Sequence, residues 1–145
     1  MTIRTFAALA AASLLLTSTG AFAQSGSSAV AGTAGSAAAG DTSASTAGIG
    51  ATSKGPSGTS SSLATGGSAA GPKTMDRSHV NATGNNGLHG DTKAMAHDGG
   101  TFSMSQTQTR VVNGTRVDSG TRTLSHVQGQ QAVRSTTRAI AGGKR

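Results

Sequence analysis

Apolar residues are unevenly distributed along the chain, and the one long apolar run lies near its start. Residues 6–16 form an eleven-residue apolar stretch that follows a basic residue, and Ala21 and Ala23 then supply the small-x-small pattern of a cleavage site. A membrane-spanning helix needs about 20 apolar residues, roughly twice this length. We therefore interpret residues 1–23 as a signal-peptide helix that is cleaved before Gln24. This interpretation predicts a periplasmic or secreted protein with no transmembrane segment after cleavage.

Beyond residue 23, apolar positions are too sparse for a conventional hydrophobic core. Leu, Ile, Val and Phe occupy only 13 of the 122 positions from 24 to 145, well under the roughly 20% below which a chain is suspected of disorder. Ordering one residue costs about 1–2 kcal/mol of backbone entropy, whereas burying one large aliphatic side chain returns about 1.5–3 kcal/mol. We therefore expect a mostly intrinsically disordered protein.

Two compositional zones precede the C-terminal segment. Ala, Gly, Ser and Thr fill 41 of the 48 positions in residues 24–71, a low-complexity composition typical of a flexible tether. Residues 72–100 are richer in His, Asn and Asp, which favour turns. We expect this second zone to be an irregular linker.

Residues 101–145 have a different pattern, in which Thr, Ser, Gln and Val alternate with Arg, as in β-strands. Asn113 and Gly114 are the dipeptide that most readily forms a type I′ hairpin turn. A two-residue loop here places Val112 opposite Thr115. We therefore predict a small antiparallel hairpin or meander near residues 102–140, of marginal stability. The expected strands are 102–112, 115–126 and 131–140, with a second reversal at Gln128–Gly129.

Charge adds a candidate function to this C-terminal segment. The chain has a net charge of +7, from 12 Lys and Arg against 5 Asp and no Glu. Arginine binds phosphate and carboxylate groups bidentately, so the segment is a candidate site for an anionic polysaccharide or lipopolysaccharide. Nucleic acid fits less well, because single-strand readers use several aromatic side chains and only Phe102 is available. The candidate polyanion-binding residues are Arg110, Arg116, Arg122, Arg134 and Arg138.

The linker contains a weaker candidate for metal binding. His89, Asp91, His97 and Asp98 lie within ten residues, and imidazole and carboxylate groups suit Zn²⁺, Cu²⁺ or Ni²⁺. Their spacing matches no tetrahedral motif. The sequence therefore leaves open a low-affinity periplasmic metal buffer, with solvated turn histidines as the alternative.

The remaining composition excludes several classes of function. There is no Cys, and hence no disulfide framework, zinc–thiolate site or cysteine nucleophile. A catalytic site needs a rigid scaffold, which a disordered chain lacks, so we expect a non-enzymatic protein without a cofactor.

Residues 101–112 are rich in Gln, Ser and Thr and lack Pro, which is compatible with cross-β stacking. Self-association as a cell-surface or matrix protein therefore remains an alternative to polyanion binding.

Overall fold

The computed structural model describes residues 27–84 and 86–142, and this part of the chain consists of strands and turns without a helix. Consecutive strands pair antiparallel in two sheets, ordered β1-β2-β3 and β4-β5-β6-β7-β8. The strands are β1 (Ser27–Ala39), β2 (Thr42–Gly55), β3 (Gly58–Ala70), β4 (Lys73–Thr83), β5 (Gly87–Asp98), β6 (Thr101–Val112), β7 (Arg116–His126) and β8 (Val133–Gly142). The expected signal peptide, with its expected cleavage site at Ala21, Ala23 and Gln24, lies outside the described residues.

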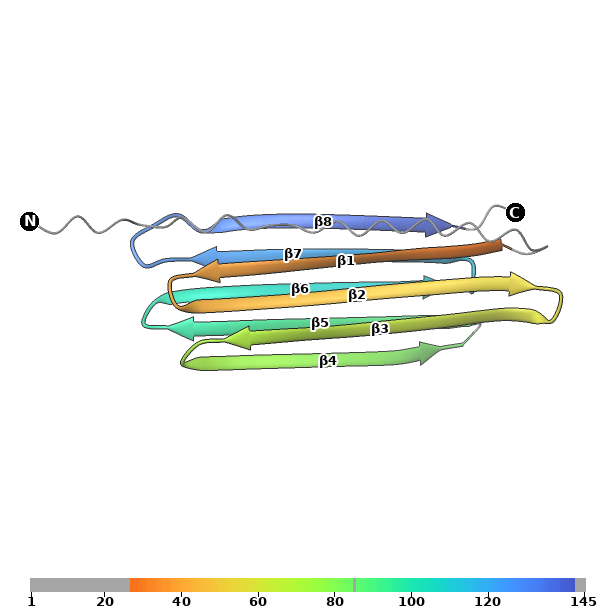
Figure 1. The fold of residues 1–145 in the computed structure, drawn as a ribbon, viewed down its shortest axis with the longest axis horizontal. Helices are drawn as coiled ribbons and strands as arrows, with labels where there is room; N and C mark the ends of the chain where they lie inside the picture. Colours follow the sequence, from red (N-terminus) through yellow and green to blue (C-terminus); the bar gives the residue numbers. More distant parts are fainter. Residues whose placement is uncertain (1–26, 85, 143–145) are drawn as a thin grey trace, which may run out of the picture.

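The two sheets pack face to face as a sandwich with nearly aligned strands. Figure 1 shows β1 beside β7, β2 beside β6 and β3 beside β5, and these strand pairs are in contact. The chain passes from the first sheet to the second through one short turn between β3 and β4. Because the five-stranded sheet is wider, its edge strand β4 is exposed along its whole length.

The expectation of a mostly intrinsically disordered chain is therefore wrong. Residues 24–71, expected to be a flexible tether, contain β1–β3, and residues 72–100, expected to be irregular, contain β4 and β5. The reason lies in the composition of the interior. Large aliphatic side chains are few, but Ala, Gly, Ser and Thr fill the space between the sheets instead.

The interior contains one small apolar cluster. Ala31, Val111 and Val117 are buried together, and Leu63 and Leu88 pack against them. Elsewhere the buried side chains are mostly alanines, threonines and serines. Burial of hydroxyl groups is unfavourable unless they form hydrogen bonds, so the stability of this interior depends on hydrogen bonds among these groups.

Hydrogen bonds between hydroxyl groups connect the two sheets. Thr33 on β1 accepts from Thr121 on β7 at 2.8 Å, and Thr121 lies 2.6 Å from Thr107 on β6. Thr107 lies 2.7 Å from Thr46 on β2, which in turn lies 2.7 Å from Ser105. The chain of hydroxyl groups thus crosses between the layers repeatedly and satisfies groups that would otherwise be buried without a partner.

Glycine allows the sheets to approach closely. A Cβ atom at Gly50 on β2 would lie 2.7 Å from Cγ1 of Val117, and one at Gly35 on β1 would lie 2.5 Å from Cγ2 of Thr121. Real Cβ atoms are not found so close to another heavy atom. Glycine at these two inward positions therefore provides the room that the opposite side chains occupy.

The predicted β-hairpin is present, but its register differs by one residue. Asn113 and Gly114 have positive φ angles of 51° and 63°, and the amide of Thr115 donates to the carbonyl of Val112 at 3.1 Å. Thr115 is nevertheless left outside the ladder, so that Val112 pairs with Arg116 rather than with Thr115. A shift of one residue exchanges the two faces of a strand. Here it directs Val117 into the interior.

The last two strands of the expected meander are also present. Gly129 has a φ of 79°, and the amide of Gln130 donates to the carbonyl of Val127 at 3.0 Å, which places the second reversal where it was expected. Leu124 pairs with Arg134, one residue away from the expected partner, Val133. The meander does not stand alone, because β4 and β5 extend its sheet and β1–β3 cover it.

Candidate anion-binding face

Basic side chains gather on the outer face of the five-stranded sheet, away from β1–β3. Of the nine Lys and Arg residues in the described part of the chain, only Lys54 lies elsewhere. Two carboxylates, Asp91 and Asp118, share this face. The eight basic residues, which we call the basic face, are Lys73, Arg77, Lys93, Arg110, Arg116, Arg122, Arg134 and Arg138.

The alternation of side chains along each strand produces this separation. In β5, the inward positions are small and buried, as at Thr92 and Ala94, whereas Lys93 between them points outward. β6 repeats the pattern, with Ser105 and Thr107 buried. Side chains two residues apart on one strand are about 7 Å apart, and neighbouring strands are about 5 Å apart. The eight basic residues therefore occupy positions on a regular grid of outward side chains, which they share with Asp91 and Asp118.

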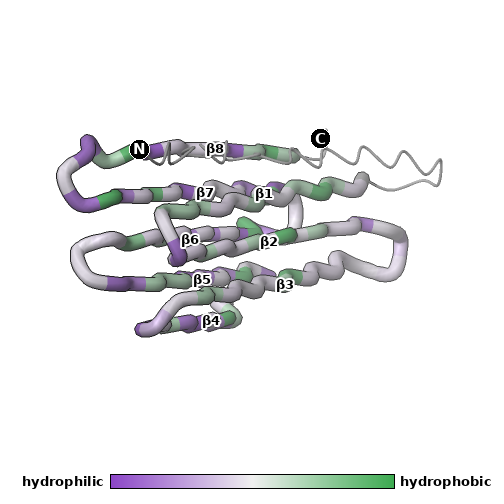
Figure 2. The backbone as a smooth tube through the Cα atoms, turned by 60° about the vertical axis from the view of Figure 1, so that its left-hand side comes forward, coloured by the Kyte–Doolittle hydropathy of each residue, from purple (hydrophilic) through white to green (hydrophobic). Residues whose placement is uncertain are grey.

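The five arginines selected from the sequence all lie on this face, on three neighbouring strands. Sequence reasoning missed Lys73, Arg77 and Lys93, because residues 72–100 were interpreted as an irregular linker. The alternation of long polar with small residues in β5 is the signal that could have identified Lys93. Figure 2 shows that hydrophilic positions are concentrated in β4–β8, whereas β1–β3 are largely neutral in hydropathy.

A groove of about 400 Å³ lies at the centre of the arginine-rich strands. Gly120 on β7 pairs with Gln108 on β6 and Arg138 on β8. Because Gly120 has no side chain, the outer face is hollowed between these two neighbours. The groove is lined by Gln106, Gln108, Arg110, Asp118, Gly120, Thr121, Arg122, Thr136, Thr137 and Arg138.

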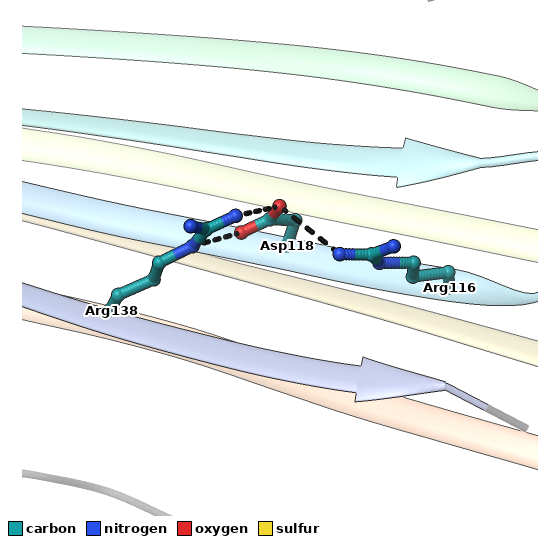
Figure 3. Close-up of polar contacts among 3 residues, drawn as sticks. All are labelled: Arg116, Asp118 and Arg138. Atoms are coloured by element: carbon teal, nitrogen blue, oxygen red, sulfur yellow. Dashed lines mark hydrogen bonds and ion pairs between the residues drawn. The ribbon is translucent and has the colours of Figure 1, made fainter.

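Asp118 organises two of the arginines. Arg138 donates to its carboxylate through Nε at 3.2 Å and Nη2 at 2.8 Å, and Nη2 of Arg116 lies 3.7 Å away on the other side (Figure 3). The hydrogen bond from Arg138 holds the pKa of Asp118 below its ordinary value, and the positive charges of Arg138, Arg116 and Arg110 lower it further. Arg110 and Arg122 line the groove without an ion pair among the described residues.

The second carboxylate on the face, Asp91, is engaged by amide groups. Gln106 and Gln108 on β6 donate to Oδ2 of Asp91 on β5 at 3.3 and 3.1 Å. These contacts fix the two glutamine side chains at the edge of the groove. Both carboxylates of the basic face therefore have donors of their own.

The four candidate metal ligands do not converge. His89, Asp91 and His97 lie on the outer side of β5, whereas Asp98 is directed to the other side by the alternation of the strand. His89 and His97 are eight residues apart, which corresponds to about 26 Å along a strand. Within residues 27–84 and 86–142, no three His, Cys, Asp or Glu side chains form a group that could hold a metal ion.

Comparison with protein families, curated protein sequences and solved structures finds no match to this chain. In the part of the chain that the structure describes, no helix is long and apolar enough to cross a membrane.

Proposed function

We propose that this is a small exported, non-enzymatic protein that binds an anionic polysaccharide or lipopolysaccharide through its basic face. The observation that carries the proposal is the placement of eight of the nine described Lys and Arg residues on one side of one sheet. The signal peptide expected in residues 1–23 would deliver the protein to the periplasm or the exterior, where such polymers are found.

The arrangement suits a repeating anionic ligand. Each exposed ion pair contributes little alone, but a row of positive charges can engage many anionic groups of one polymer at once. The groove over Gly120 adds depth, with Arg110, Arg122 and Arg138 around it. Guanidinium groups bind phosphate, sulfate or carboxylate through two parallel hydrogen bonds, so this groove is the expected centre of binding.

Binding fits the groove better than catalysis does. Its one carboxylate, Asp118, is held ionised by Arg138 and Arg116, whereas a general acid needs a pKa near the working pH. The other outward side chains that line the groove are those of arginine, glutamine and Thr136. These groups bind and orient anions.

The test measures binding to immobilised dextran sulfate, a simple anionic polysaccharide, at increasing salt. We expect affinity to fall steeply as sodium chloride rises from about 50 to about 500 mM, because screening weakens exposed charge pairs. The triple variant Arg110→Gln, Arg122→Gln, Arg138→Gln should bind at least about tenfold more weakly, since three charge-assisted contacts are lost. Salt-independent binding, or full binding by the triple variant, would reject the proposal.

Lys54→Gln is the matched control for this experiment. Lys54 is an exposed basic residue at the end of β2, outside the basic face. Removing its charge should leave affinity nearly unchanged. If Lys54→Gln lost as much affinity for dextran sulfate as a single groove variant such as Arg122→Gln, the attraction would depend on net charge alone. That result would contradict specific binding at the basic face.

A second candidate function, self-association, is favoured by the three-stranded sheet. Its edge strands β1 and β3 contain neither charged residues nor Pro, although charged residues and Pro commonly protect exposed edges. Residues 101–112, the segment that the sequence suggested for stacking, instead form β6 and are paired on both sides. Self-association would therefore begin at β1 or β3. The variant Ser62→Lys on β3 should suppress fibrils that bind thioflavin, and unchanged fibril growth would exclude this route.

A further inference from the structure

The three methionines of the described chain lie in one cross-strand row. Met75 on β4 pairs with Met95 on β5, which pairs with Met104 on β6, and Leu124 on β7 pairs with Met104. We call these four residues the methionine row. The row crosses four of the five strands on the same side of the sheet as the basic face.

The methionine row is accessible to a partner. Met75 is 48% exposed, and the other three side chains are half-buried among their neighbours. Phe102 lies in the next row along β6, where its ring centroid is 5.6 Å from that of His126. The row is an apolar strip on a face that also contains eight basic residues, and an exposed apolar patch can mark contact with an apolar partner.

Positive charges border the methionine row on both sides. Arg77, Lys93 and Arg122 occupy the row two residues away on one side, and Lys73 lies on the other side. Arg134 pairs with Leu124 and continues the row at its end on β8. Basic side chains therefore lie about 7 Å from the apolar strip, the distance between residues two apart on a strand. Three of them lie on one side of the strip, and Lys73 lies on the other.

These observations fit the surface of an anionic lipid bilayer. Methionine is unbranched and flexible, so it adapts to irregular apolar surroundings. Long Lys and Arg side chains can bury their aliphatic stems while their charged ends remain at the headgroups. Anionic headgroups attract basic residues near the membrane surface. A pure polysaccharide would use the charges but would leave the methionine row exposed to water.

The thioether groups could also suggest a soft monovalent cation, because Met is a ligand for Cu(I). The charges around the row oppose this assignment. Lys93 and Arg122 lie in the adjacent row, and Arg134 lies beside Leu124. Each would repel a bound cation, whereas each would attract an anionic headgroup.

We propose that the methionine row inserts among the headgroups of an anionic lipid bilayer while the surrounding Lys and Arg side chains bind the phosphates. This inference rests on the proposed function, because it specifies that the anionic groups bound by the basic face belong to a lipid bilayer. It predicts that binding to lipid depends on apolar side chains, whereas binding to a free polysaccharide does not.

The experiment compares two probes with the same protein preparations. The first probe is vesicles of phosphatidylcholine with about 30% phosphatidylglycerol, whose negative surface attracts basic residues, and the second is dextran sulfate. The test variant is Met75→Thr, Met95→Thr, Met104→Thr, and the matched control is Met75→Leu, Met95→Leu, Met104→Leu. All three positions face outward, and circular dichroism checks that both variants retain the wild-type β-structure.

We expect the Thr variant to bind the vesicles at least about tenfold more weakly, because three apolar side chains are lost. The Leu variant should bind vesicles like the wild type, and all three proteins should bind dextran sulfate equally. Wild-type binding to dextran sulfate but not to the vesicles would overturn this inference and leave the proposed function in place. Unchanged vesicle binding by the Thr variant would also overturn it. Wild-type binding to neither probe would reject the proposed function as well.

Discussion

The hydroxyl oxygen of Thr46 on β2 lies 2.7 Å from that of Thr107 on β6. This contact joins the two sheets through side-chain hydrogen bonding at a place where most sandwiches have apolar contacts. Thr107 is fully buried, and Thr46 is 3% exposed. The stability of the sandwich therefore depends on satisfied hydroxyl groups as well as on buried apolar area.

Replacing Thr107 with Val should destabilise the protein. Val has nearly the same shape, but it removes hydrogen bonds to Thr46 and Thr121. When a buried polar group loses its hydrogen-bond partner, the protein loses about 1–3 kcal/mol of stability. The free energy of unfolding, measured by urea denaturation, should fall by an amount in this range.

Thr65→Val is the control for that prediction. The hydroxyl of Thr65 is buried and has no hydrogen-bond partner among the described residues. Removing an unsatisfied hydroxyl should leave stability unchanged or raise it. Equal destabilisation by both substitutions would mean that the hydroxyl network contributes nothing specific.

A methyl group at Gly48 should also destabilise the sandwich. An added Cβ would collide with the hydroxyl of Thr109 and lie 2.8 Å from Cγ2 of Thr107. Overpacking of an interior costs about 1–3 kcal/mol, so the Gly48→Ala variant should have a lower melting temperature. Gly66→Ala is the matched control, because nothing lies within 4 Å of a Cβ there. If Gly48→Ala were as stable as Gly66→Ala, the sheets would be farther apart than described.

The same glycines and threonines explain why the sandwich could not be predicted from the sequence. In β2, inward Thr46 and Gly48 alternate with outward Ser45 and Ala47, so the two faces have almost the same hydropathy. The usual signal of a half-buried strand is alternation of apolar with polar residues, and it is absent here. The count of large aliphatic residues also underestimated the stabilisation that offsets the entropy cost of folding. Close approach of the sheets and hydrogen-bonded hydroxyl groups stabilise the interior, and the count includes neither.

The C-terminal strands were more predictable because their turns have distinctive chemistry. Asn113–Gly114 and Gln128–Gly129 identified both reversals, and all five selected arginines share one face. The register could not be inferred from the turn alone. Pairing of Val111 with Val117 on the buried side determines it, and that preference depends on the other sheet.

The Asn113 turn offers a test of local backbone strain. Asn113 has a φ of 51°, a conformation in which most L-residues lose about 1–2 kcal/mol. Asn113→Val should therefore lower the melting temperature, whereas Asn113→Gly should leave it nearly unchanged because Gly adopts positive φ readily. If Asn113→Val and Asn113→Gly had the same melting temperature, the positive φ at this position would not be a source of strain.

Replacement of Asp118 by Asn connects stability with binding. The pKa of Asp118 is lowered in the folded protein by the hydrogen bond from Arg138 and by the charges of neighbouring arginines. Its ionised form therefore stabilises the fold above the ordinary pKa of 3.8, and this contribution is lost as the pH falls through the lower folded-state value. The stability difference between wild type and Asp118→Asn should be small but measurable near neutral pH, and it should disappear in strong acid.

The same substitution should strengthen binding to dextran sulfate. Without the carboxylate, Arg138 and Arg116 lose their ion-pair partner, and the groove gains one unit of net positive charge. Asp41→Asn is the control, because Asp41 lies in the turn between β1 and β2 and outside the basic face. Tighter binding by Asp118→Asn alone would support the groove as the centre of anion binding. An equal gain in both variants would indicate that only net charge matters, and a loss in Asp118→Asn would show that its ordering of Arg138 outweighs its negative charge.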